Sequence, residues 1–172
     1  MGWYRNSYPK ITVEQCLIFS IFALKRDGIL KHADGWTGAS MWRNNRGEQT
    51  AAIRTTYMPQ SQAIQLEYVV TENATGRNTN VCYTVNVTRT RCNFGGWRYW
   101  FVCPTSRPGS TCNRRVGKLY LPPGGVYFGC RHCYNLTYRS CQESKRSRML
   151  WRLFHPGHFR KRYLARPKRK FK

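Results

Sequence analysis

Four cysteines in the second half of the chain have the spacing of a metal site. Cys103 and Cys112 are separated by eight residues, Cys130 and Cys133 by two, and 17 residues lie between the pairs. In a C-x2-C turn both thiolates face one ion while backbone N–H groups support the sulfurs. The pattern therefore predicts one structural Zn²⁺ held by these four thiolates, with no open coordination position for water.

Two alternatives to this metal site remain open at the level of the sequence. Cys92 or Cys141 could take the place of Cys112, because the first pair has a wider spacing than usual. His155 and His158 could form a second metal site, although the proline between them and the nearby cations favour a loop that contacts phosphate.

The remaining cysteines do not indicate disulfides. No secretory signal is visible, and Cys16 and Cys82 fall within predicted regular elements without evident partners. We therefore interpret Cys16, Cys82, Cys92 and Cys141 as small buried or half-buried apolar side chains. A reducing, cytoplasmic location is expected. The longest apolar run, 16–24, is too short to cross a membrane.

The segment between the two cysteine pairs predicts a β-hairpin. Residues 116–121 and 126–129 have the composition of strands, and Pro122-Pro123-Gly124-Gly125 is a turn signal. Two ligand pairs on either side of a hairpin are typical of a zinc ribbon. We assign this ribbon to residues 97–139.

Residues 1–96 predict a helix packed on a sheet. Thr12 and Gln15 form a capping-box pattern, so a helix is expected over 13–26, ending at Asp27-Gly28. Around Ile53, Ile64 and over 81–87, apolar and polar residues alternate, which predicts an antiparallel meander of about four strands. The expected fold is α+β: an N-terminal helix on an antiparallel meander, a small zinc ribbon, and a basic helical or extended C-terminal tail at 140–172.

The charge distribution predicts a polyanionic partner. Lys and Arg total 30 against 7 Asp and Glu, a net charge of +23. Residues 97–172 hold 19 basic residues and one acid, Glu143. Such a field attracts phosphate groups and makes binding depend steeply on salt. Arg43, Arg54 and Arg89 are expected to extend the basic surface from the exposed face of the sheet.

The basic tail itself predicts two kinds of structure. Ser140 and Glu143 form a second capping-box pattern, so a basic amphipathic helix is expected to about Phe154, followed by extended arms that contact phosphate. The candidate nucleic-acid contacts of the ribbon and the tail are Arg98, Arg114, Arg115, Lys118, Arg131, His132, Lys145, Arg146, Arg148, Arg152, Arg160, Lys161, Arg162, Arg166, Lys168, Arg169 and Lys170.

Aromatic residues alternate with these cations near the ribbon. Trp97, Trp100, Phe101 and Tyr127 offer faces on which bases stack. A ribbon has little core of its own, so the same rings could instead pack against the metal site or the first unit. The sequence leaves both interpretations open.

Part of the chain resembles a known family. The residues that carry the likeness are 92–104, 114–125, 130–138 and 140–143, together with Thr12-Val-Glu-Gln-Cys16 and 24–30. Across roughly 12–143 the chain is similar to a family of bacterial and mobile-element, phage-like proteins with a zinc-ribbon core. The resemblance implies the ribbon and a bacterial or phage setting. The family's first cysteine pair is often closer together than it is in this chain.

The function expected from these patterns is non-catalytic nucleic-acid binding. The ribbon and the tail would contact the RNA or DNA backbone, alone or within a larger nucleoprotein complex, without a membrane or a small-molecule substrate. The alternative is a phage or mobile-element module that docks on, or inhibits, a machine that processes nucleic acid. An enzyme is not expected, because the few acids, such as Glu48, Glu67 and Glu72, form no recognisable motif.

Overall fold

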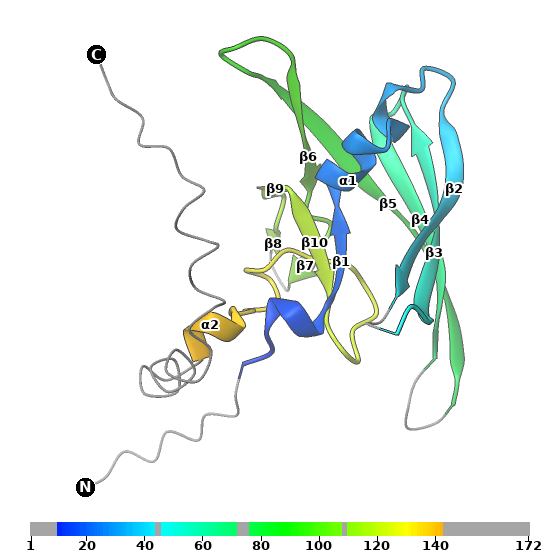
Figure 1. The fold of residues 1–172 in the computed structure, drawn as a ribbon, viewed down its shortest axis with the longest axis vertical. Coiled ribbons are helices and arrows are strands. Elements are labelled where there is room, and N and C mark those ends of the chain that lie inside the picture. The colour runs from blue at the N-terminus through cyan, green and yellow to red at the C-terminus, as the bar shows by residue number, and fades with distance from the viewer. Residues whose placement is uncertain (1–9, 44–45, 72–75, 108–109, 143–172) are drawn as a thin grey trace, which may run out of the picture. The chain divides into compact units, whose positions relative to one another are not determined.

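The structure is a computed structural model that describes residues 10–43, 46–71, 76–107 and 110–142 (Figure 1). The chain divides into a unit of residues 1–137 and a second unit that begins at Tyr138. The described part of the second unit forms the short helix α2 (Arg139–Gln142). The predicted tail contacts from Lys145 to Lys170 lie outside the described residues. Among the helices that can be traced in the described ranges, none has the length and apolar character of a membrane span.

The first unit is built on a curved, antiparallel, six-stranded sheet (Figure 1). Its strands lie in the order β2-β3-β4-β5-β6-β9. Their bounds are β2 Trp36–Arg43, β3 Gln49–Met58, β4 Ala63–Thr71, β5 Asn78–Arg91, β6 Trp97–Val102 and β9 Arg115–Val116. The alternation in the sequence places β3, β4 and β5 correctly, since Ile53, Ile64 and Val85 are buried in the core.

Shorter elements complete the first unit. β1 (Leu17–Ser20) pairs with β10 (Lys118–Leu121), and β7 (Ser106–Arg107) pairs with β8 (Ser110–Thr111). The helix α1 (Ile21–Arg26) follows β1 directly, between the 3₁₀ turns η1 (Val13–Gln15) and η2 (Ile29–Lys31). Ile21 and Leu24 of α1 are buried.

The prediction of one helix over 13–26 is wrong. The capping residues do meet, because the Thr12 N–H donates to the Gln15 side chain at 2.8 Å, but they begin a single 3₁₀ turn. Leu17–Ser20 then pairs with β10, a hundred residues later in the chain. Phe19 is 98% buried in this strand, and its neighbours Leu17 and Ile18 are half-buried. Burial against a distant strand outweighs the local helix signal.

The predicted fold class is therefore also wrong. The described chain is mostly antiparallel β-structure with two short α-helices, and it is not an N-terminal helix on a meander followed by a helical tail. The predicted strand over 126–129 does not form either. Gly129 alone makes a bridge to Tyr120, and β10 takes β1 as its strand partner.

The core reaches from the sheet to the cysteines. Phe128 is fully buried, with its ring centroid 6.0 Å from that of Phe19 and 6.1 Å from that of Trp42. Phe19 stacks on Phe101 at 5.1 Å. Cys103 and Cys130 belong to the same buried cluster as these rings. The position of the cysteines is thus fixed by the main hydrophobic core.

Candidate metal centre

Two chain segments bring the four predicted cysteines together. Cys103 directly follows β6, and its N–H donates to the carbonyl of Arg114 at 2.9 Å. The insert after Cys103 folds back through the β7–β8 pair, so that the Cys112 N–H reaches the carbonyl of Thr105 at 3.0 Å. Cys130 and Cys133 lie in the turn that follows the bridge at Gly129. The wide first spacing is therefore compatible with one site.

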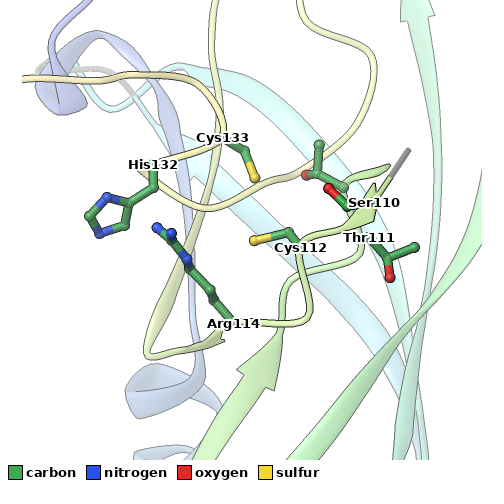
Figure 2. A pocket seen from close by; sticks show the side chains of 7 residues that line it. Ser110, Thr111, Cys112, Arg114, His132 and Cys133 are labelled. Atoms are coloured by element: carbon green, nitrogen blue, oxygen red, sulfur yellow. The ribbon is translucent and has the colours of Figure 1, made fainter. Parts of the chain in front are cut away.

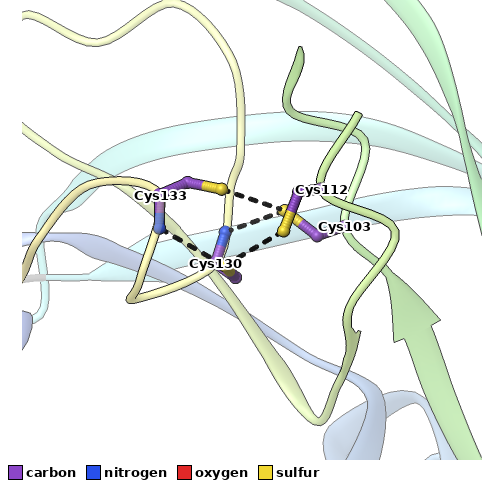
Figure 3. A group of neighbouring side chains, drawn as sticks. All are labelled: Cys103, Cys112, Cys130 and Cys133. Atoms are coloured by element: carbon purple, nitrogen blue, oxygen red, sulfur yellow. Dashed lines mark hydrogen bonds between the residues drawn. The ribbon is translucent and has the colours of Figure 1, made fainter. Parts of the chain in front are cut away.

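The four Sγ atoms form a compact group, which we call the thiol cluster (Figure 3). All lie within 4.8 Å of one another. The Sγ atoms of Cys103 and Cys133 are 3.9 Å apart, and those of Cys112 and Cys130 are 3.8 Å apart. These distances are far longer than a disulfide bond, and none of the four cysteines forms a disulfide. The thiol cluster could hold a metal ion.

Backbone N–H groups point at the sulfurs of the thiol cluster. The N–H of Cys130 lies 3.2 Å from the Sγ of Cys103, and the N–H of Cys133 lies 3.4 Å from the Sγ of Cys130 (Figure 3). The Cys103 thiol in turn donates to the Thr105 hydroxyl oxygen at 3.5 Å. Backbone N–H donors in these positions stabilise thiolates, which are the form of cysteine that binds metals.

The turns around the thiol cluster require unusual backbone conformations. Asn113 has a φ of 46° and Asn135 a φ of 48°, both in the left-handed region. Asparagine tolerates this region better than most residues. Asn113 lies one residue after Cys112, and Asn135 lies two residues after Cys133. The chain therefore changes direction directly after each of these cysteines.

Burial and hydrogen bonding shift the pKa values of these thiols in opposite directions. Burial raises the pKa of Cys130 and of Cys133 above the ordinary thiol value. Burial acts in the same direction on Cys112, but hydrogen bonds from the backbone of Arg114 and from the neighbouring thiols outweigh it, so the pKa of Cys112 is lowered. The thiols of Cys112, Cys130 and Cys133 therefore differ in how readily they ionise.

A polar hollow of about 230 Å³ lies beside the thiol cluster (Figure 2). Thr105, Ser110, Thr111, Arg114 and His132 line it together with Cys112 and Cys133. The hollow leaves these two cysteines half-buried, whereas Cys103 and Cys130 are almost completely enclosed. The cluster thus has one side that reaches solvent.

Comparisons with known proteins add nothing to this geometry. No family model, curated protein or solved structure matches the chain.

The group of four does not include the other described cysteines. Cys92 is half-buried in the turn after β5. Cys141 is exposed in α2 of the second unit rather than buried or half-buried as predicted, and Cys16 is buried near Tyr120. Cys82 is exposed on β5 rather than buried as predicted, because it occupies an outward position of the pleat between Val81 and Tyr83. Cys112 is therefore the residue that completes the described group of four, whereas His155 and His158 lie outside the described residues.

The predicted cations of the ribbon lie at the surface of the first unit. Arg98, Arg114, Arg115, Lys118 and His132 are exposed, and Arg131 is half-buried. Arg54 is paired with Glu67 at 3.9 Å on the outer face of the sheet. Arg89 does not share that face, because it follows the inward positions of Val85 and Val87 along β5.

The aromatic residues divide between the two roles left open by the sequence. Phe101 is fully buried in the core, whereas Trp97 and Tyr127 keep 44% and 54% of their surface exposed. Phe94, which the sequence reasoning did not single out, is fully exposed in the turn between β5 and β6. Its position between Asn93 and Gly95-Gly96 is the turn signal that would have placed it at a hairpin tip.

Proposed function

We propose that this protein is a non-catalytic nucleic-acid-binding protein built around one structural zinc ion, and that it contacts the RNA or DNA backbone through the cysteine-containing segment and the basic C-terminal segment. The observation that carries the proposal is that the thiol cluster lies in a stretch of the chain whose Lys and Arg residues are not balanced by acids. Residues 73–142 contain ten Lys and Arg and no Asp or Glu.

Zinc fits the thiol cluster. A tetrahedral zinc tetrathiolate with Zn–S bonds of about 2.3 Å has sulfurs about 3.8 Å apart. Two pairs of sulfurs that share no member, Cys103–Cys133 and Cys112–Cys130, are separated by 3.9 and 3.8 Å. Four thiolates leave no coordination position for water, so the ion would hold the fold together and would not activate a substrate.

The surrounding charge supports a phosphate-bearing partner. A zinc tetrathiolate carries a net charge of about −2, which nearby cations such as Arg114 and Arg131 help to offset. Arg98, Arg115 and Lys118 are exposed beyond it. Concentrated positive charge of this kind attracts nucleic acid and releases counterions when it binds.

The direct test is the affinity of the zinc-loaded protein for fluorescent RNA and DNA, measured by anisotropy at increasing salt. We expect tight binding at low salt and a steep salt slope. Arg115→Gln should weaken binding to all sequences and lower the slope by about 1. Arg43→Gln, which removes the same charge from β2, is the matched control and should change both quantities less.

The proposal fails if the wild-type protein binds these nucleic acids only weakly and loses binding to all of them near physiological salt. It also fails if Arg115→Gln and Arg43→Gln have equal effects. The contribution of a cation to binding would then not depend on its position near the thiol cluster. A protein partner would become the better explanation of the basic surface.

A further inference from the structure

One part of the six-stranded sheet extends beyond its neighbours. β4 begins at Ala63, which pairs with Asn86, and β6 pairs with β9 only at Phe101 and Val102. Within the described chain, residues 88–91 of β5 therefore pair with residues 97–100 of β6 and with no third strand. We call this two-stranded ribbon, residues 88–100, the β-arm. It is the green hairpin at the upper left of Figure 1.

Polar and cation–π contacts hold most of the β-arm. At its base Tyr99 packs against the main core, and the Lys25 ammonium donates to the carbonyl of Trp97 at 2.8 Å. A lone two-stranded hairpin is marginally stable in water. In the β-arm the Trp100 indole N–H donates to the Thr90 hydroxyl at 3.0 Å. The guanidinium of Arg89 lies 4.4 Å from the ring of Trp97, and that of Arg98 lies 5.6 Å from the ring of Trp100. One Arg–Trp pair therefore lies on each face of the arm.

Part of the apolar surface of the β-arm is exposed to solvent. Phe94, at the tip, is fully exposed, and Trp97 is 44% exposed. Single exposed apolar residues are common, but these two lie on one hairpin together with Arg89, Arg91 and Arg98. Interleaved aromatic faces and cations are the combination that binds bases and phosphates of unpaired nucleic acid.

A hollow of about 220 Å³ lies at the base of the β-arm, on the face that carries Arg89 and Tyr99. Tyr57 and Tyr99 line it together with Lys31, His32 and Arg89, and no Asp or Glu is among its lining residues. This volume lies below the range of drug-sized ligand pockets, which suits a single base or phosphate. Asp34, nearby in the sequence, lines a neighbouring hollow instead.

We propose that the β-arm binds single-stranded nucleic acid by stacking unpaired bases on Phe94 and Trp97, while Arg89 and Arg91 hold the adjoining phosphates. The inference rests on the proposed nucleic-acid function and gives it a base-contacting element separate from the thiol cluster. RNA and DNA share the unpaired bases and phosphates that this surface recognises.

Single strands suit the β-arm better than a duplex. A two-stranded ribbon can enter the major groove, but it then reads base edges through polar side chains. The tip of the β-arm offers the flat ring of Phe94, and only an unstacked base presents a face to such a ring.

The test compares an ordinary single strand with an abasic strand of the same length and charge. The full-length zinc-loaded protein is titrated with a fluorescent single-stranded RNA, its DNA equivalent, an abasic DNA strand and a duplex. The variants are Phe94→Ala and Trp97→Ala. Val69→Ala removes an exposed apolar side chain from β4 and is the matched control.

We expect Phe94→Ala to weaken binding to base-containing single strands by about 5- to 150-fold. Binding to the abasic strand should change by less than about twofold, because a strand without bases has nothing to stack on the ring. Val69→Ala should leave every affinity unchanged. The preference between RNA and DNA then identifies the natural source of the strand.

The inference is overturned if Phe94→Ala leaves binding of base-containing strands unchanged, or weakens the abasic strand or the duplex equally. Phe94 has no core contact, so this variant keeps the test valid even if Trp97→Ala disturbs the arm. If the wild-type protein binds none of the probes, the proposed function fails first and the inference fails with it.

Discussion

The backbone N–H of Cys130 donates to the Sγ of Cys103 at 3.2 Å and so joins two segments that are 27 residues apart. Cys103 follows the last residue of β6, and Cys130 follows the bridge between Gly129 and β10. Both cysteines are nearly inaccessible to solvent and belong to the main core. A metal bound at these thiols would therefore tie the six-stranded sheet to the β1–β10 pair.

Loss of one thiol of the cluster should therefore cost both the metal and stability. We expect Cys112→Ser to lower zinc content well below one ion per chain, with a fall of several kcal/mol in the free energy of unfolding. Zinc content by elemental analysis and a denaturant titration measure the two effects. Cys92→Ser is the control and should keep its zinc, since Cys92 lies outside the thiol cluster. Equal losses in both variants would contradict the assigned ligands.

Gly129→Ala should disturb the same site without removing a ligand. A Cβ at Gly129 would overlap the Thr105 hydroxyl and lie 2.8 Å from the ring of Tyr134. Tyr134 cannot move away easily, because its hydroxyl donates to the carbonyl of Tyr127. We expect destabilisation by about 1–3 kcal/mol, together with faster transfer of zinc to a chelator.

Gly117→Ala provides the comparison for this overlap. A Cβ at Gly117 would meet the ring of Phe22, which is 48% exposed and can turn towards solvent. Its cost should stay below about 1 kcal/mol. If Gly117→Ala proved as damaging as Gly129→Ala, close packing at the thiol cluster would not explain the effect.

Phe128→Ala should strongly destabilise the protein. The ring is fully buried and contacts those of Phe19, Trp42 and Tyr68. Its loss leaves a cavity at the point where the sheet meets the segment leading to Cys130, so we expect a cost of about 3–5 kcal/mol in a denaturant titration. Phe94→Ala should change the unfolding midpoint little. A small effect of Phe128→Ala would contradict the continuity between the core and the thiol cluster.

The sequence predicted the local features that depend on neighbouring residues. The alternation around Ile64 and Val85 predicted strands, and the spacing of Cys130 and Cys133 predicted a shared site. Both signals are short-range, since a strand repeats every second residue and a C-x2-C turn is complete within four.

Features that depend on distant pairing were predicted wrongly or missed. Thr12 and Gln15 form their capping contact, yet Leu17–Ser20 forms a strand instead of the predicted helix because it pairs with β10. A continuous apolar run suits a buried helix and a buried strand equally well. The β-arm was missed for a related reason: its exposure depends on where β4 begins and β9 ends, which only the register shows.

High pH should destabilise the zinc-loaded protein through its buried tyrosines. Burial raises the pKa of Tyr68 and of Tyr83 above the ordinary value of about 10. Because the folded pKa is the higher one, this stabilisation is complete below about pH 10 and is lost as pH rises further. The Tyr68 hydroxyl donates to the carbonyl of Val126 at 2.6 Å, a bond that ionisation removes.

Denaturant midpoints measured between pH 8 and 11 test this linkage, with tyrosinate absorbance recorded in parallel. Tyr68→Phe should be less stable than the wild type at pH 8, by about 1–2 kcal/mol, because the Val126 carbonyl loses its donor. It should then lose less stability as pH rises. Parallel pH profiles for the two proteins would contradict the role given to Tyr68.

The most direct test of the central claim is the absorption spectrum of the protein loaded with Co²⁺ in place of zinc. A tetrahedral site of four thiolates gives intense visible and thiolate-to-metal charge-transfer bands, at one ion per chain. We predict this spectrum for the wild type and for Cys92→Ser, and its loss or shift in Cys112→Ser and Cys133→Ser. A weak octahedral spectrum, or uptake that survives both ligand substitutions, would contradict a four-thiolate metal centre.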